Sequence, residues 1–150
     1  MEYVIRSATA SDINTIITFT VREAQESQGS EVDLIAVERG VSSAFTRHPR
    51  SQYWIMENAD GSAVAHTSII KEWSDFCGKD YWWIQSFYIA PEHRGRGLAD
   101  QLINHLSAAA ISADALELRL YVHGDNQRAI RAYQRCGFSA SPYLMMKTSL

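Results

Sequence analysis

One stretch of this sequence restricts the fold more than any other: a strand that ends in a glycine-rich turn and continues into a helix. The strand is expected over Tyr81–Ile89, where both faces are apolar, as in a central strand covered on each side. Pro91 closes the strand. The helix is expected over Gly97–Ser112, because apolar residues recur there at helical spacing. A strand that feeds a helix in this way favours an α/β fold.

The turn between them, within Pro91–Ala99, has the features of an anion site. The first N–H groups of a helix have no partner within the helix, and they lie at the positive end of its dipole. Gly95 and Gly97 allow close backbone approach to an anion, and Arg94 and Arg96 add positive charge. The P-loop sequence and the three-glycine dinucleotide fingerprint are both absent. We interpret the turn as a pyrophosphate cradle; the alternative is a basic turn that only caps a helix.

The rest of the chain supplies the other elements of one α/β domain with a mixed sheet, over residues 1–150, without a linker or repeat. Thr9 to Asp12 offer helix-capping chemistry, and Gln28–Ser30 interrupt the helix that follows. Further helices and strands follow from the apolar spacing. Strands are expected at 3–5, 53–56, 63–70, 116–122 and 143–147, and helices at 13–24, 34–45 and 126–136, the last ending at Gly137.

Charge and hydropathy narrow the classes of function. The net charge of -3 argues against a nucleic-acid partner, which requires a basic field. No apolar run approaches the roughly 20 residues that span a bilayer, and the N-terminus lacks the build of a signal peptide. A cytoplasmic protein without membrane contact is therefore expected, with Cys77 and Cys136 as reduced thiols. The histidines show no metal-ligand spacing, so no metal site is expected.

The turn also carries a resemblance to a known family. Arg94 to Ala99 match the Gln/Arg-x-x-Gly-x-Gly/Ala motif of the GNAT superfamily of N-acetyltransferases, at the same strand–helix junction. The start of the chain, with Arg6 and the segment Ala8–Asp12, resembles the start of that family, and Gly137-Phe138 resemble its C-terminal part. The likeness covers nearly the whole chain. It implies a central mixed sheet that is splayed at a cofactor slot, with helices on both faces.

The resemblance also implies how acetyl-CoA would be held. The turn would bind the pyrophosphate, and main-chain groups of the central strand would pair with the pantetheine arm like an added strand. A backbone N–H near Ile89 would polarise the thioester carbonyl. The residues given a cofactor-binding role are Phe87, Tyr88, Ile89, Arg94, Gly95, Arg96, Gly97, Leu98, Ala99 and Asn126.

Two proton transfers are needed to acetylate an amine, one from the amine and one to the leaving thiolate. Tyr133 stands at the family's tyrosine position and is the candidate general acid. The alternative is a core tyrosine, because Tyr133 shares an apolar face with its neighbours on the expected helix. The central strand carries no acid at Trp82–Ser86. The general base is therefore left open between Glu72, Asp75 and a water chain.

The resulting hypothesis is an N-acetyltransferase that moves the acetyl group of acetyl-CoA to a primary amine of a small molecule or peptide. Direct attack in a ternary complex is favoured over a route through Cys77 or Cys136. The alternatives are a non-catalytic CoA-binding module and an interaction protein whose turn is only a cap. The acceptor and the use of larger acyl groups are left open, since fold does not select a substrate. A homodimer is possible.

Overall fold

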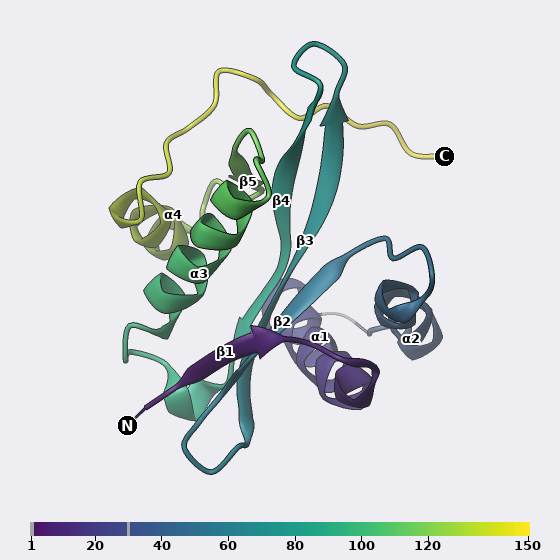
Figure 1. The fold of residues 1–150 in the computed structure, drawn as a ribbon, viewed down its shortest axis with the longest axis vertical. Coiled ribbons are helices and arrows are strands. Elements are labelled where there is room, and N and C mark those ends of the chain that lie inside the picture. Colours follow the sequence, from purple (N-terminus) through teal and green to yellow (C-terminus); the bar gives the residue numbers. More distant parts are fainter. Residues whose placement is uncertain (1, 30) are drawn as a thin grey trace.

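A five-stranded sheet in the order β1-β2-β3-β4-β5 runs through the middle of the computed structural model, which describes residues 2–29 and 31–150 (Figure 1). The first four strands pair antiparallel, and β4 pairs parallel with β5, so the sheet is mixed, as expected. The strands are β1 (Val4–Ser7), β2 (Gln52–Glu57), β3 (Ala63–Ser74), β4 (Lys79–Ile89) and β5 (Leu118–Leu120).

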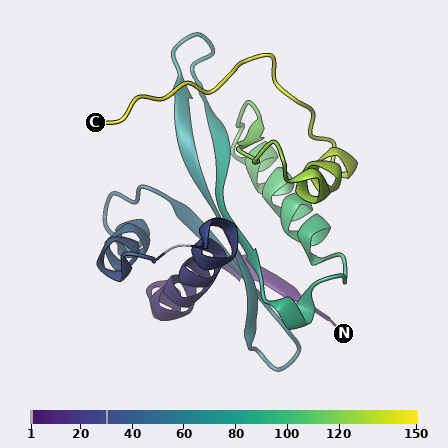
Figure 2. The same ribbon diagram turned by 180° about the vertical axis from the view of Figure 1, so that it is seen from behind.

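Helices cover both faces of this sheet, again as expected. Figures 1 and 2 show α1 (Ile13–Gln28) and α2 (Leu34–Ser42) on one side, and α3 (Leu98–Ser112) and α4 (Gln127–Arg135) on the other. Gly29 ends α1 in the left-handed conformation. Of the residues expected to interrupt this helix, Ser30 lies outside the described part of the chain. Short 3₁₀ turns at Ala10–Asp12, Ser43–Phe45 and Pro91–His93 complete the order.

Alternation along β2 explains why two helical layers can share one sheet. Trp54 packs with Trp82 of β4 and Leu106 of α3. The residues on either side of it turn to the opposite face, where Ile55 packs with Ile16 of α1. All of these side chains are at least nine-tenths buried. The sheet therefore has a core on each face, and α1 and α3 are fixed on opposite sides of β4.

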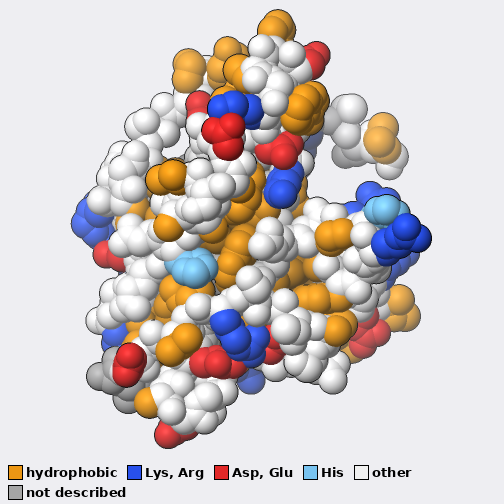
Figure 3. Space-filling model, viewed as in Figure 1, with side chains coloured by type: hydrophobic (Ala, Val, Ile, Leu, Met, Phe, Trp, Pro, Cys, Tyr) orange, Lys and Arg blue, Asp and Glu red, His pale blue; other side chains and the backbone are white. Residues whose placement is uncertain are grey.

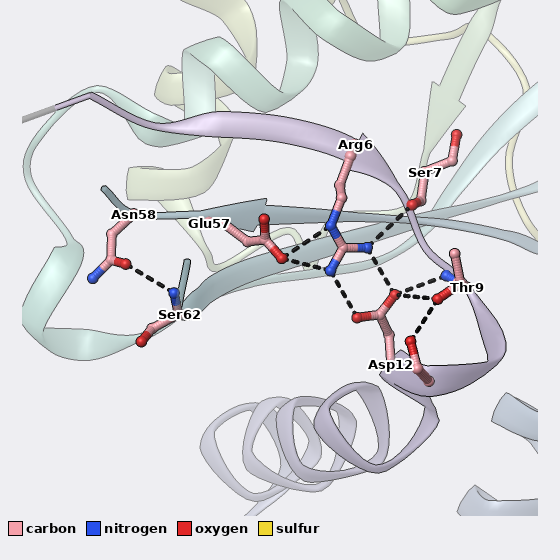
Figure 4. Close-up of polar contacts among 8 residues, drawn as sticks. Arg6, Ser7, Thr9, Asp12, Glu57, Asn58 and Ser62 are labelled. Atoms are coloured by element: carbon pink, nitrogen blue, oxygen red, sulfur yellow. Dashed lines mark hydrogen bonds and ion pairs between the residues drawn. The ribbon is translucent and has the colours of Figure 1, made fainter. Parts of the chain in front are cut away.

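An ion-pair network fixes the start of the chain to this frame (Figure 4). The Arg6 guanidinium donates to both carboxylate oxygens of Asp12, at 2.8 and 2.9 Å, and its Nε donates to Glu57 at 2.9 Å. Asp12 also accepts the backbone N–H of Thr9 at 2.7 Å, which completes a capping box before α1. The network thus joins β1, β2 and the first turn of the α1 region.

Asp12→Asn is expected to lower the free energy of unfolding by about 1 to 2 kcal/mol at pH 7. The Arg6 hydrogen bond lowers the pKa of Asp12 from 3.8 to about 2. Because the folded-state pKa is lowered, the contribution is complete above pH 3.8 and is lost as pH falls through about 2. Urea unfolding of the wild type and of Asp12→Asn, each at pH 7 and pH 2.5, checks this. Asp60→Asn, in an exposed turn, is the control; equal losses in the two variants would contradict the prediction.

Two expected strands differ from the structure. The strand expected at 116–122 is shorter, and only Leu118–Leu120 pair with β4. The strand expected at 143–147 is wrong: this segment has no strand structure, and the side chains of Leu144 and Met146 are 89% and 91% exposed. Apolar composition alone does not make a strand, because a strand is stabilised by packing and pairing partners that this segment lacks.

No helix among the described residues combines the length and the apolar character needed to cross a membrane. Over the same residues, no group of three or more His, Cys, Asp or Glu side chains is arranged to hold a metal ion.

Candidate functional site

The sheet opens between β4 and β5. Parallel pairing joins Trp82–Ile84 to Leu118–Leu120 and then stops. From residue 85 to residue 89, β4 keeps β3 on one side, and no described strand lies on the other. We call this unpaired side of residues 85–89 the slot. It confirms the splayed sheet that the resemblance implied.

A β-bulge at Gln85, the first residue of the slot, sets the direction of the main-chain groups that follow. Ser68 pairs with Ser86 and Ile69 pairs with Ile84, so Gln85 is left unpaired. Ala90 N–H donates to Val64 O at 2.9 Å. This bond shows which residues beyond the bulge turn their main-chain groups toward β3. By alternation, the main chain of Tyr88 faces β3. Of the three residues expected to meet a pantetheine arm, Phe87 and Ile89 therefore turn their main-chain groups to the slot.

Two charged side chains reach these slot-facing groups. Phe87 N–H donates to Glu23 Oε1 of α1 at 3.1 Å. Arg94 Nε donates to Ile89 O at 2.8 Å, and its Nη2 donates to both oxygens of Glu26 at 2.7 and 2.9 Å. Arg94 was expected to add charge to the anion site. Its guanidinium is instead paired with α1, so that it ties the turn to that helix.

The glycine turn, residues 94–97, lies where the sequence predicted it, between the end of β4 and the start of α3. Gly95 and Gly97 have φ angles of 73° and 75°, the left-handed region that a side chain rarely adopts. Gly97 is the N-cap of α3, and Leu98 at its first position is 2% exposed. The buried anchor at Leu98 orients the first-turn N–H groups of α3, including that of Ala99, at the end of the slot.

Glu23 and His66 form a second feature of the site that the sequence analysis missed. Glu23 Oε2 lies 3.6 Å from His66 Nε2. His66 is fully buried, and neither ring nitrogen has a hydrogen-bond partner in the described part of the chain. Its ring packs against Phe19, Tyr53 and Tyr88. Buried nitrogens without a hydrogen-bond partner are rare in native structures. A functional role is one explanation where they do occur.

The sequence did contain signals for this pair. His66-Thr67-Ser68 is a polar run inside an otherwise apolar strand, and all three residues are fully buried. Glu23 follows Phe19 by four residues, which places it on the same face of α1 as that buried ring. A carboxylate on the buried face of a helix, opposite a buried histidine, indicates a site rather than a solvated charge.

Tyr133, the candidate general acid, lies half-buried on α4 with its ring against Phe138 at 5.7 Å. Burial raises the pKa of Tyr133, and the negative charge of Glu23 raises it further. The phenol is therefore protonated at neutral pH. Asn126 is the N-cap of α4, where its side-chain oxygen accepts the Ala129 N–H at 3.1 Å. Its Nδ2 group takes no part in this cap.

The acids first considered as general bases lie elsewhere. Glu72 pairs with Tyr81 in the ladder, which places it about 20 Å along β4 from Phe87. Its carboxylate lies 3.4 Å from Arg119. Asp75 is exposed in the β3–β4 turn, beyond Glu72. Glu23 is thus the acid that the structure brings to the slot.

A cavity of about 400 Å³ lies beside the slot on the α1 and α2 side of the sheet. We call it the α1–α2 cavity. Residues from α1, α2, β2, β3 and β4 line it, including Thr20, Val41, Arg50, Tyr53, Gln85 and Ser86. A second cavity of about 420 Å³ shares Ile70 and Gln85 with it and is lined by Trp83 and Tyr121, whose rings stack at 4.6 Å.

Comparison with a protein-family model finds a match over residues 3–138 to the family described as "Acetyltransferase (GNAT) family". Two curated relatives are similar in sequence. A mycothiol acetyltransferase from Corynebacterium aurimucosum is 28% identical over 110 residues, which cover 71% of this chain and 36% of that protein. A streptothricin acetyltransferase from Escherichia coli is 29% identical over 80 residues, covering 53% and 43%. The chain thus spans less than half the length of either relative.

Solved structures are similar over the whole chain. A possible acetyltransferase from Clostridium difficile 630 superposes with a TM-score of 0.91 at 26% identity, covering 100% of this chain and 99% of the other. A ribosomal-protein-alanine N-acetyltransferase from Brucella melitensis biovar Abortus 2308 gives a TM-score of 0.79 at 16% identity, covering 99% of each chain. At that lower identity the likeness is one of fold alone.

Proposed function

The chain belongs to the acetyltransferase (GNAT) family, and from this premise we propose that it transfers the acetyl group of acetyl-CoA to a primary amine of a small molecule or peptide. One observation carries the proposal. The sheet opens beside the glycine turn, and Glu23 of α1 lies close enough to Tyr133 of α4 to raise the pKa of its phenol. Burial is the larger cause of that raised pKa, and the contribution of Glu23 supports an electrostatic coupling between a phenol and a carboxylate from opposite layers.

The residues at the opening suit the parts of acetyl-CoA, which supplies an activated acyl thioester. The first-turn N–H groups of α3 and the left-handed Gly95 and Gly97 suit the pyrophosphate. The slot-facing main chain of Phe87 and Ile89 suits the amides of a pantetheine arm. The Nδ2 group of Asn126 is a further donor for that arm.

Glu23 is the general base in this proposal. The nitrogen of the amine bonds to the acetyl carbon as the carbon–sulfur bond breaks. Glu23 takes one proton from the amine, and Tyr133 gives one proton to the departing sulfur, so the charges balance. The buried imidazole of His66, 3.6 Å from the Glu23 carboxylate, keeps that carboxylate oriented.

Direct transfer is supported by the state of the two thiols. Burial and the neighbouring Asp100 raise the pKa of Cys136, so its thiolate is disfavoured. Cys77 is exposed in the β3–β4 turn, beyond Glu72 and away from the slot. Neither thiol has the properties of an acetyl carrier.

Gly97→Glu is expected to raise the Kd for acetyl-CoA at least about tenfold. The substitution strains the left-handed N-cap of α3 and places a negative charge at the anion site. Calorimetric titration with acetyl-CoA measures this. Gly61→Glu is the matched control, because Gly61 has a φ of 77° in the β2–β3 turn and the same strain arises away from the site.

Equal binding by the two glycine variants would contradict the cradle. Thiol release across a panel of primary amines then tests the reaction itself. Release with any amine supports an enzyme, whereas acetyl-CoA binding without release would favour the non-catalytic CoA-binding module. The cytoplasmic location and the homodimer stay predictions.

A further inference from the structure

The α1–α2 cavity borders the slot at Gln85 and Ser86, which makes it the place to look for the identity of the amine. Ser86 lines the cavity and directly precedes Phe87, whose N–H is held by Glu23. Thr20 lines it too, one helical turn before Glu23 on α1. The charge of Glu23 also contributes to the raised pKa of Tyr53, after burial. The carboxylate of Glu23 therefore lies near the cavity, next to residues that line it.

Size restricts the occupant. A volume of about 400 Å³ lies at the small end of ligand sites in proteins. Its lining residues come from α1, α2, the loop between α2 and β2, and three strands. It suits a small molecule better than an extended polypeptide.

A positive charge lines the same cavity. Arg50 is the one charged side chain among the described residues that line it. Arg6, Arg94 and Arg119 each have a carboxylate within 4 Å, but Arg50 has none in the described part of the chain. Figure 3 shows basic side chains gathered over the region between α2 and β2, the part of the chain that contains Arg47 and Arg50.

The remaining wall carries neutral hydrogen-bonding groups. Ser43 and Ser51 line the cavity beside Arg50, and Thr20 lines it from α1. The Thr20 hydroxyl is buried and has no hydrogen-bond partner within residues 2–29 and 31–150. A buried polar atom without a partner indicates a group that a ligand can satisfy. These hydroxyls share the wall with the guanidinium of Arg50 and with apolar side chains, among them Val41 and Ile70.

Resting on the function proposed above, we propose that the acceptor is a small zwitterion, a primary amine that also carries a carboxylate, of which a free amino acid is the simplest example. Its ammonium group faces Glu23 and its carboxylate faces Arg50. The planar fork of an arginine suits a carboxylate with two parallel hydrogen bonds. A polyamine would bring a second positive charge against Arg50, and an amine without a carboxylate would leave Arg50 without a partner.

Matched pairs of acceptors test this, each pair sharing a carbon skeleton with and without the carboxylate. The pairs are phenylalanine with phenethylamine, leucine with isopentylamine, and γ-aminobutyrate with propylamine. We expect kcat/KM to be at least about tenfold higher for the carboxylate member of at least one pair. The readout is thiol release at saturating acetyl-CoA.

Arg50→Gln is expected to remove this preference by raising KM for the carboxylate member, with the rate on the plain amine and the Kd for acetyl-CoA unchanged. Arg47→Gln is the matched control: Arg47 lies in the same loop but does not line the cavity. Equal or faster turnover of every plain amine by the wild type would overturn the proposal. So would an equal loss on both members of a pair in Arg50→Gln. In either case thiol release would still support the acetyltransferase.

If no member releases thiol, the same pairs are titrated into the protein saturated with CoA. The zwitterion site is supported if a carboxylate member binds more tightly than its plain amine and if this binding is lost in Arg50→Gln. Absence of binding by every carboxylate member contradicts it. The two failures are thus separated. Absence of thiol release concerns the reaction, and absence of binding by the carboxylate members concerns the acceptor.

Discussion

Tyr133→Phe is expected to lower kcat by about 10²- to 10⁴-fold, the usual contribution of a general acid. The variant keeps the ring that packs on Phe138 and loses only the hydroxyl proton. The Kd for acetyl-CoA is therefore expected to change by less than about twofold. Stopped-time thiol release gives kcat, and calorimetry gives Kd. Tyr143→Phe is the control, since the side chain of Tyr143 is 85% exposed and lies in the C-terminal segment.

The pH dependence of the wild type adds a second readout for Tyr133. Burial and Glu23 raise the pKa of this phenol above the ordinary value of 10.0. A group that must be protonated to act loses its function as pH rises through its pKa. The alkaline limb of kcat is thus expected above pH 10, and an unchanged kcat in the phenylalanine variant would exclude Tyr133 as the acid.

Glu23→Gln is expected to lower kcat/KM by about 10²- to 10³-fold at pH 7. The amide oxygen of glutamine can still accept the Phe87 N–H, so the local structure is retained while the proton acceptor is lost. An acceptor that arrives as the neutral amine has one proton fewer to lose than one that arrives as an ammonium ion. The deficit is therefore expected to shrink as the pH approaches the pKa of the acceptor amine.

The control for Glu23→Gln is Glu38→Gln, an exposed acid on α2. Circular dichroism and acetyl-CoA titration establish that both variants are folded and bind the donor. If the pH–rate profile of Glu23→Gln runs parallel to that of the wild type, Glu23 is not the proton acceptor. A water chain would then be the better account of the base.

The sequence predicted what depends on local chemistry. The glycine turn, the strand before it and the helix after it were placed correctly because glycine spacing and apolar periodicity report on neighbouring residues. The likeness to a family then extended this local pattern to the whole fold, including the splayed sheet.

The rest depended on contacts between distant parts of the chain. Glu23 reaches Phe87 across 64 positions, and Arg94 reaches Glu26 across 68, so neither contact leaves a local pattern. The bulge at Gln85 decides which main-chain groups turn to the slot, and a strand pattern of period two does not reveal it. The segment 143–147 has the composition of a strand, but strand formation is decided by a partner elsewhere in the fold.

The slot has one more consequence, for the behaviour of the protein in solution. An unpaired strand edge is a template on which other chains can add strands, the first step of aggregation, and charged side chains at the edge are one way in which natural sheets prevent it. Here Glu23 occupies the N–H of Phe87 and Arg94 occupies the carbonyl of Ile89. Before any ligand arrives, these two side chains protect the exposed edge from pairing with a neighbouring molecule.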